Sequence, residues 1–422
     1  MNKMTFFNEF SNEATKKTRS SFIGGFFLFL GIMFLACSAF FAHHLHYLFL
    51  SGSDLQHPPL LNDIFTKVLT VTPLRLLISL IIYIFAKNYK FFTVIISISV
   101  SSLVLACFLL YLTDHAALHD PLHEYECTLI PSSLMGMLFM PAAICLSAPL
   151  LFKSIPSKYH STVSACVLLT VAFGGILACS MKNTVMHMRT SMWAYALIFT
   201  ATCSLCCFLV AKFYYFKAGL QAPEKNIHEG KIQFSPYILL FLSGALLGIT
   251  IGFPMLLSNP YFTESLILNF AGGLFPSFLH WILLSLFLLP ANYAFKKFGL
   301  VKTMYASILG TFFLAVILEH NAEMAIPTYV VFRLFIAFSS ALCLVSLFLI
   351  IYKTTQKTNS IYSPVLWTSW GYIATIALRA FIGQSCQLPV ILVSVLMLLI
   401  GLLLYQFMLI KYYKKDLASF SH

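Results

Sequence analysis

Three arginines stand inside long apolar stretches of this sequence: Arg75, Arg333 and Arg379. The chain strongly prefers lysine, with 21 lysines to 5 arginines, yet three of its five arginines lie in such stretches. Inside a membrane an ionised side chain costs at least about 2.5–3.5 kcal/mol. Arginine always carries its charge, and its planar fork binds carboxylate or phosphate through two hydrogen bonds. No acidic residue lies mid-stretch as a partner, so we predict that these arginines bind an anion.

Polar residues accompany each arginine at helical spacing, as expected for the wall of a water-filled cavity. They are Thr72, Ser79 and Tyr83 around Arg75, Tyr329 and Ser340 around Arg333, and Ser369, Tyr372 and Thr375 before Arg379. The predicted substrate-binding residues are Arg75, Arg379, Arg333, Tyr372 and Ser79. Two alternatives stay open. Each arginine could cap backbone carbonyls or pair with a loop carboxylate, and Arg333 and Arg379 could extend to the membrane surface.

Histidines offer two further kinds of chemistry. His280 stands beside Trp281 within an apolar stretch and is a candidate for carrying protons or contacting substrate. A packed histidine bonded to a carbonyl is the alternative. His115 and His119 are spaced i, i+4 in a polar segment and could hold a metal ion on a helix. A solvated polar loop is the simpler alternative, since the spacing matches no specific zinc motif.

The elements that carry these residues are predicted to be membrane helices. Hydrophobic residues make up 59% of the 422-residue chain and charged residues only 9%, far below the roughly 25% of a soluble domain. Each crossing needs about 20 apolar residues. We therefore predict an all-α membrane protein with about twelve transmembrane helices. The spans are 21–48, 64–86, 91–113, 129–152, 161–180, 191–212, 236–257, 272–295, 299–318, 327–352, 362–383 and 388–411.

The polar segment 213–235 divides these spans into two sets of six. The predicted domains are an N-terminal six-helix bundle at 1–212, a cytoplasmic linker at 213–235 and a C-terminal bundle at 236–422. With both termini in the cytoplasm, 20 of the 26 basic residues fall on the cytoplasmic side, as positive residues do in inner membranes. This distribution accounts for the net charge of +12 without nucleic-acid binding. We expect no cleaved signal peptide, because the first apolar run is too long for one.

This arrangement resembles the major facilitator superfamily. The family carries a short basic loop between its second and third helices, repeated between the eighth and ninth. The later loop here reads "ANYAFKKFGLVKTM" and matches the pattern at Lys297, Gly299 and Lys302, and the earlier loop keeps Lys87 and Lys90. The resemblance implies two pseudo-symmetric bundles, a gating role for these five residues, and a cavity lined by helices 1, 4, 7 and 10 with 2, 5, 8 and 11 beside them. It also implies that helices 3, 6, 9 and 12 face lipid.

We therefore predict a secondary transporter that moves a small anionic solute across the cytoplasmic membrane by alternating access. Candidate solutes are carboxylates, phosphorylated metabolites and polycarboxylate iron chelates. The expected partners are this solute and the lipid bilayer, with no cofactor, no enzymatic activity and a monomeric chain. The alternatives are a metal or metal-chelate transporter that uses the outer histidines, and a membrane-embedded transferase or flippase.

Overall fold

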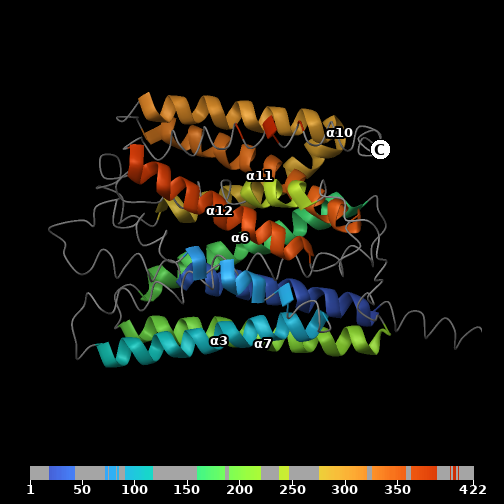
Figure 1. The fold of residues 1–422 in the computed structure, drawn as a ribbon, viewed down its shortest axis with the longest axis vertical. Helices are drawn as coiled ribbons and strands as arrows, with labels where there is room; N and C mark the ends of the chain where they lie inside the picture. Colours follow the sequence, from blue (N-terminus) through green and yellow to red (C-terminus); the bar gives the residue numbers. More distant parts are fainter. Residues whose placement is uncertain are drawn as a thin grey trace, which may run out of the picture.

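The computed structural model describes eleven stretches of the chain, and every regular element in them is helical. The described residues are 19–42, 72–74, 76–81, 83–84, 91–116, 159–185, 190–219, 237–246, 275–320, 326–357 and 363–386, with 400, 403, 404 and 407. The labelled helices are α3 (Phe91–Ala116), α6 (His160–Val185), α7 (Thr190–Lys217), α10 (Phe275–His320), α11 (Ile326–Lys357) and α12 (Ser363–Cys386). Helices also cover Arg19–Ala42, Tyr237–Leu246 and the described residues around Ser79. Figure 1 shows the long helices lying roughly side by side.

The long helices coincide with predicted spans, and their apolar length suits a membrane. Four helices of the described part are long and apolar enough to cross it, namely Arg19–Ala42, Phe92–Tyr111, His160–Met181 and Ala194–Lys217. These confirm a multi-pass helical protein. Span 129–152 lies outside the described residues, and only four residues of span 388–411 are described. The count of twelve transmembrane helices therefore stays a prediction.

Helix α7 extends beyond the predicted end at residue 212. It continues to Lys217, because Tyr215 is buried at 1% exposure and holds the last turn against its neighbours. The helix then ends in a turn at Gly219, whose φ of 66° is a left-handed value that glycine adopts without strain. The first residues of the predicted linker are therefore helical. The division of the chain into two bundles stays a prediction.

Helix α10 unites two predicted spans. It contains the spans 272–295 and 299–318 almost entirely, and its backbone breaks at Gly299, where φ is 77°. A residue with a β-carbon adopts this conformation only with strain, which explains why glycine stands there. The predicted tight turn between these two spans is thus confirmed, and it is short enough that the helices meet with almost no loop between them.

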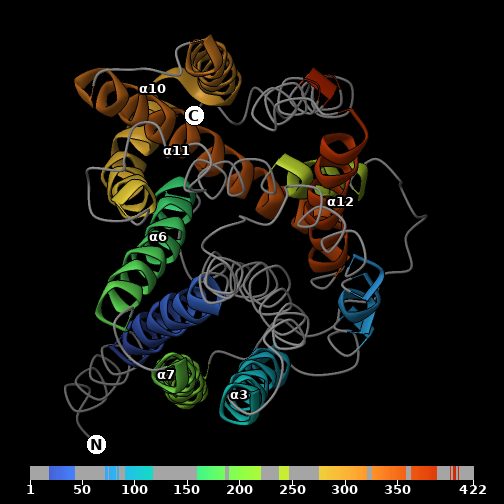
Figure 2. The ribbon, with the colours of Figure 1, turned by 90° about the vertical axis from the view of Figure 1, so that its left-hand side faces the viewer.

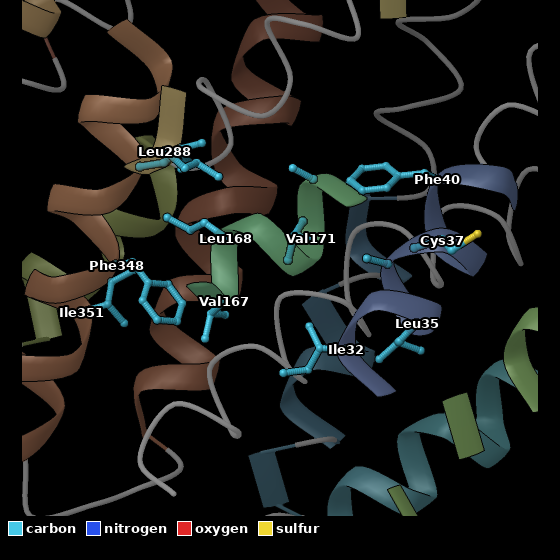
Figure 3. Close-up of a cluster of buried hydrophobic side chains, with 14 of the residues drawn as sticks. Ile32, Leu35, Cys37, Phe40, Val167, Leu168, Val171, Leu288, Phe348 and Ile351 are labelled. Carbon is cyan, nitrogen blue, oxygen red and sulfur yellow. The ribbon is translucent and has the colours of Figure 1, made fainter. Parts of the chain in front are cut away.

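Helix α6 lies at the centre of the packing. It runs between the Arg19–Ala42 helix on one side and the α10–α11 pair on the other (Figure 2). Figure 3 shows a continuous apolar cluster across this arrangement, with Phe40 and Ile32 on the Arg19–Ala42 helix, Val171 on α6, and Leu288 and Phe348 beyond it. The core therefore joins segments from before and after the predicted linker.

The burial of the spans separates inner from outer helices. In the span of α3 39% of residues are buried and in that of α7 44%, against 61% in both the Arg19–Ala42 helix and α6. Large apolar side chains such as Val104 and Phe199 are mostly exposed on the outer pair. Apolar exposure on this scale suits contact with lipid tails. The third and sixth predicted helices thus face outward, as the family resemblance implies, and the first and fifth lie inside.

Candidate functional site

The predicted site residues are distributed over several helices. Arg333 lies on α11, Arg379 on α12, and His280 near the start of α10, but their side chains are outside the part that the structure describes. Arg75 lies wholly outside it, one residue before Leu76. The anion-binding roles of the three arginines and the proton-carrying role of His280 stay predictions.

A hydrogen bond joins the two segments that carry Arg75 and Arg379. The indole Nε1 of Trp370 on α12 donates to Ser79 Oγ at 2.7 Å. Ser79, which is only 2% exposed, in turn donates to the carbonyl oxygen of Leu76 at 2.8 Å. Ser79 is a predicted substrate-binding residue, and in this structure its hydroxyl is engaged by two protein groups. The bond spans 291 residues of sequence and fixes the second predicted helix against the eleventh.

The polar stripe on α12 does not face open water in this structure. Ser369, Tyr372 and Thr375 are 2%, 5% and 6% exposed, so the predicted cavity wall is packed against protein here. Thr375 Oγ1 donates to the carbonyl of Gly371, the ordinary way in which a helical threonine satisfies its hydroxyl. A role for this stripe in a water-filled cavity stays a prediction.

Two glycines explain why α12 is packed so closely. A β-carbon at Gly244 would collide with the carbonyl oxygen of Thr368, and one at Gly371 would collide with the carbonyl oxygen of Phe241. Small residues at a crossing let two helix backbones touch, which is the usual way that membrane helices associate. The Tyr237–Leu246 helix and α12 therefore form one tight pair, with Gly244 and Gly371 at its points of closest approach.

Trp281 forms a second contact across the predicted halves. This residue of α10 is 5% exposed, and its ring centroid lies 4.6 Å from that of Phe40 on the Arg19–Ala42 helix. On α6, a β-carbon added to Gly175 would lie 2.5 Å from Trp281 Cδ2. The indole thus occupies the space that a side chain at Gly175 would take. The neighbouring Gly174 serves a different contact, because a β-carbon there would lie 2.6 Å from the carbonyl oxygen of Met33.

A polar cluster forms the third contact, near the first turn of α6. Lys296 Nζ of α10 donates to Thr162 Oγ1 at 2.9 Å, and Asn292 Nδ2 approaches the same oxygen at 3.4 Å. Asn292 is 7% exposed, and its Oδ1 has no hydrogen-bond partner. A buried amide with one bond depends heavily on that bond, because an orphaned polar group costs free energy. Thr162 therefore connects α6 to α10 through both side chains.

The remaining predicted residues are placed as follows. Lys297 and Lys302 are exposed on α10 on either side of Gly299, and Lys297 Nζ lies 5.5 Å from the centre of the Phe298 ring. Lys87 and Lys90 lie outside the described residues, as does His119. His115 falls in the last turn of α3, with its side chain undescribed. Among the described residues no group of three potential metal ligands occurs, so the metal pair stays a prediction.

Sequence reasoning missed the contacts between the halves. It draws attention to Trp281 only as the neighbour of His280, and it does not single out Trp370, Thr162 or Asn292. One signal was available: the adjacent pair Gly174–Gly175 within a span marks a helix that two different neighbours approach closely. The pair does not indicate which residues approach it.

The comparisons with known proteins bear on the fold alone. No family model matches the sequence, and no curated protein matches it. The crystal structure of the human organic anion transporter MFSD10 (TETRAN) does match, with a TM-score of 0.61 over 92% of this chain and 99% of that chain, at 13% sequence identity. The chain therefore shares its fold with that transporter structure.

Proposed function

We propose that this protein is a secondary transporter that moves an organic or other small anion between two helical bundles by alternating access. The major facilitator fold, shared with a human organic anion transporter, supports the transporter class. The observation that carries the anion assignment is the hydrogen bond from Trp370 to Ser79. It joins the two helices that hold Arg75 and Arg379, so two guanidinium groups belong to neighbouring segments.

The sequence positions favour a shared site for these arginines. The second and eleventh predicted helices run in opposite directions, so Arg75 and Arg379 fall on the same side of the Ser79–Trp370 bond. At 1.5 Å per residue, Arg379 is about 13 Å along the helix from Trp370, and Arg75 is about 6 Å from Ser79. The two positions thus differ by about 7 Å along the helix axes, and two cationic residues at that spacing suit a carboxylate or phosphate group. Arg333 on α11 would assist, and His280 is the candidate for proton coupling.

The burial of the polar stripe on α12 fits a transporter whose cavity is closed around these residues in this structure. Ser369 and Tyr372 are packed in this structure, whereas substrate contact requires them to meet solvent at another stage. In alternating access a single site faces the two sides in turn, through rocking of the bundles. On this proposal, separation of α12 from the Ser79 segment would expose the polar stripe.

The test is uptake of labelled anions into proteoliposomes that contain the purified full chain. The panel holds an aromatic carboxylate, an aliphatic dicarboxylate and a sugar phosphate, compared for wild type, Arg75→Ala and Arg379→Ala. The matched control is Arg189→Ala, an arginine outside every predicted span. Loss of uptake in both site variants, with the control unaffected, would support the proposal. Equal uptake in all four proteins would refute it, and uptake of zinc or iron that depends on His115 and His119 would favour the metal transporter instead.

A further inference from the structure

The contact between α6 and α10 includes one polar residue in a stripe that is otherwise apolar. Buried residues recur along α10 at helical spacing, namely Trp281, Leu284, Leu288, Asn292 and Phe295. The α6 helix lies against this stripe, because Gly175 meets Trp281 at one end and Thr162 bonds to Asn292 at the other. Asn292 is the polar member of the stripe and is only 7% exposed.

The Asn292 amide is satisfied at one end only. Its Nδ2 donates to Thr162 Oγ1 at 3.4 Å, which is long for a hydrogen bond. Its Oδ1 is buried and has no hydrogen-bond partner in the described part of the chain. Turning the amide over would put the nitrogen in that place, so one end lacks a partner in either orientation. A buried polar group without a partner raises the free energy of the state that buries it.

Water lies close to this amide. Tyr293, the next residue, is 67% exposed, Lys296 one turn further is exposed, and Thr162 is half-buried. A small separation of α6 from α10 at this end would therefore hydrate Asn292. The other end of the contact, at Gly175, is about 20 Å away along α6 and is held by apolar packing. The two helices can thus separate at Thr162 while they stay packed at Gly175.

We propose that Asn292 favours separation of α6 and α10 at this end and acts as a built-in release for the Lys296–Thr162 bond. The closed contact leaves one end of the amide dry, whereas the open contact hydrates it, so the amide raises the free energy of the closed state alone. The bond from Lys296 Nζ to Thr162 Oγ1, at 2.9 Å, acts in the opposite sense and holds the contact closed. A single polar residue lowers the stability of an apolar helix contact in the same way in coiled coils.

The opposing effects of Asn292 and Lys296 keep the closed and open states close in free energy. Alternating access requires such a balance, because a helix contact that is too stable would not reopen. The role in transport therefore rests on the proposed function. The separation itself requires no solute, so it can be measured independently of transport.

The experiment measures the distance between α6 and α10 at this end, in the purified full chain in lipid nanodiscs. p-Acetylphenylalanine replaces Tyr159, just before α6, and Tyr293 on α10, which are 47% and 67% exposed. Each carries a nitroxide label, so the native cysteines stay in place. Double electron–electron resonance then gives the ratio of open to closed molecules.

Asn292→Leu is the main variant, because leucine has the same branched skeleton without the polar atoms. We expect it to lower the open-to-closed ratio about tenfold, as the removal of one unpaired buried polar group implies. Asn292→Ala removes the amide without added bulk and is expected to lower the ratio by less. Thr162→Val should raise the ratio, because Asn292 and Lys296 both lose their acceptor.

The matched control is Ser102→Ala. Ser102 Oγ is also buried without a partner among the described residues, but it lies on α3, which packs against α7. The control is expected to leave the open-to-closed ratio unchanged. It separates an effect at the α6–α10 contact from a general gain in stability.

A lower ratio in either Asn292 variant, with the Ser102 control unchanged, would support the proposal. An unchanged or higher ratio in both Asn292 variants would overturn it, and so would an equal fall in the control. A single distance in wild type that Thr162→Val does not alter would overturn it as well. Because no solute enters this measurement, anion uptake that does not depend on Arg75 and Arg379 would count against the proposed function alone.

Discussion

Replacing Gly175 by alanine tests whether Trp281 holds α6 and α10 together. The added β-carbon would lie 2.5 Å from Trp281 Cδ2 and 2.6 Å from Cε2, closer than packed atoms approach. The ring cannot move aside freely, because it is 5% exposed and also packs against Phe40. Overpacking of this kind costs about 1–3 kcal/mol. Gly175→Ala should therefore lower the free energy of unfolding by about that amount.

A double-mutant cycle gives this prediction its sharpest form. Trp281→Ala alone should cost about 3–5 kcal/mol, the usual cost of truncating a buried aromatic residue. In that background the alanine at residue 175 has room. Its cost should vanish or reverse sign, because alanine favours a helix over glycine by about 1 kcal/mol. The expected coupling between the two substitutions is about 1–3 kcal/mol.

The measurement is reversible unfolding of the purified protein in mixed micelles of mild detergent and dodecyl sulfate, followed by circular dichroism. The matched control is Gly174→Ala, whose β-carbon would meet the carbonyl oxygen of Met33 at 2.6 Å instead of the indole. Trp281→Ala should leave the cost of Gly174→Ala unchanged. If the effects of Gly175→Ala and Trp281→Ala simply add, the contact is not as the structure has it.

Two further substitutions test the polar contacts between the predicted halves. Ser79→Ala removes the acceptor of the partly buried Trp370 indole and should cost about 1 kcal/mol, with a shift in tryptophan fluorescence that Ser79→Thr does not produce. Thr162→Val removes the hydroxyl that both Lys296 and Asn292 reach and should lower the melting temperature, because it leaves the Asn292 amide without a partner. Thr162→Ser keeps the hydroxyl and should melt close to wild type. A valine variant as stable as wild type would mean that water satisfies Asn292.

The helices were predictable because each span is long, apolar and bounded by charge. The prediction 91–113 corresponds to Phe91–Ala116, and 327–352 to Ile326–Lys357. Gly299 was predictable as a turn, since two basic residues and a glycine interrupt two apolar runs. The end of α7 was not, because the aromatic run before Lys217 reads equally well as a helix end or as the start of a loop. Burial of Tyr215 decides the question, and burial depends on Gly24 and Phe92 far away in sequence.

The candidate site, like the fold, was predictable only in part. The types of residue indicate the chemistry, since an arginine in an apolar span is costly wherever its helix lies. The partners of such residues depend on packing. Ser79 shares a helical face with Arg75 in the sequence, but its bond to Trp370 follows from how α12 lies against that segment. Periodicity places a residue on a face of its helix, and it does not decide whether that face meets water or another helix, as the buried Ser369 and Tyr372 demonstrate.

The contacts between α6 and α10 differ in strength along their length. Thr162 and Gly175 are 13 positions apart in the sequence, about 20 Å along one helix. At the first point the contact is polar, and Lys296 is exposed, so water can replace its hydrogen bond at a net cost of only about 0.5–1.5 kcal/mol. At Gly175 the contact is the Trp281 indole, which is packed into the space beside the glycine. Separating the two helices there loses apolar packing that water does not restore. The two helices therefore separate more readily at Thr162 than at Gly175, which makes Trp281 the natural pivot of any motion between them.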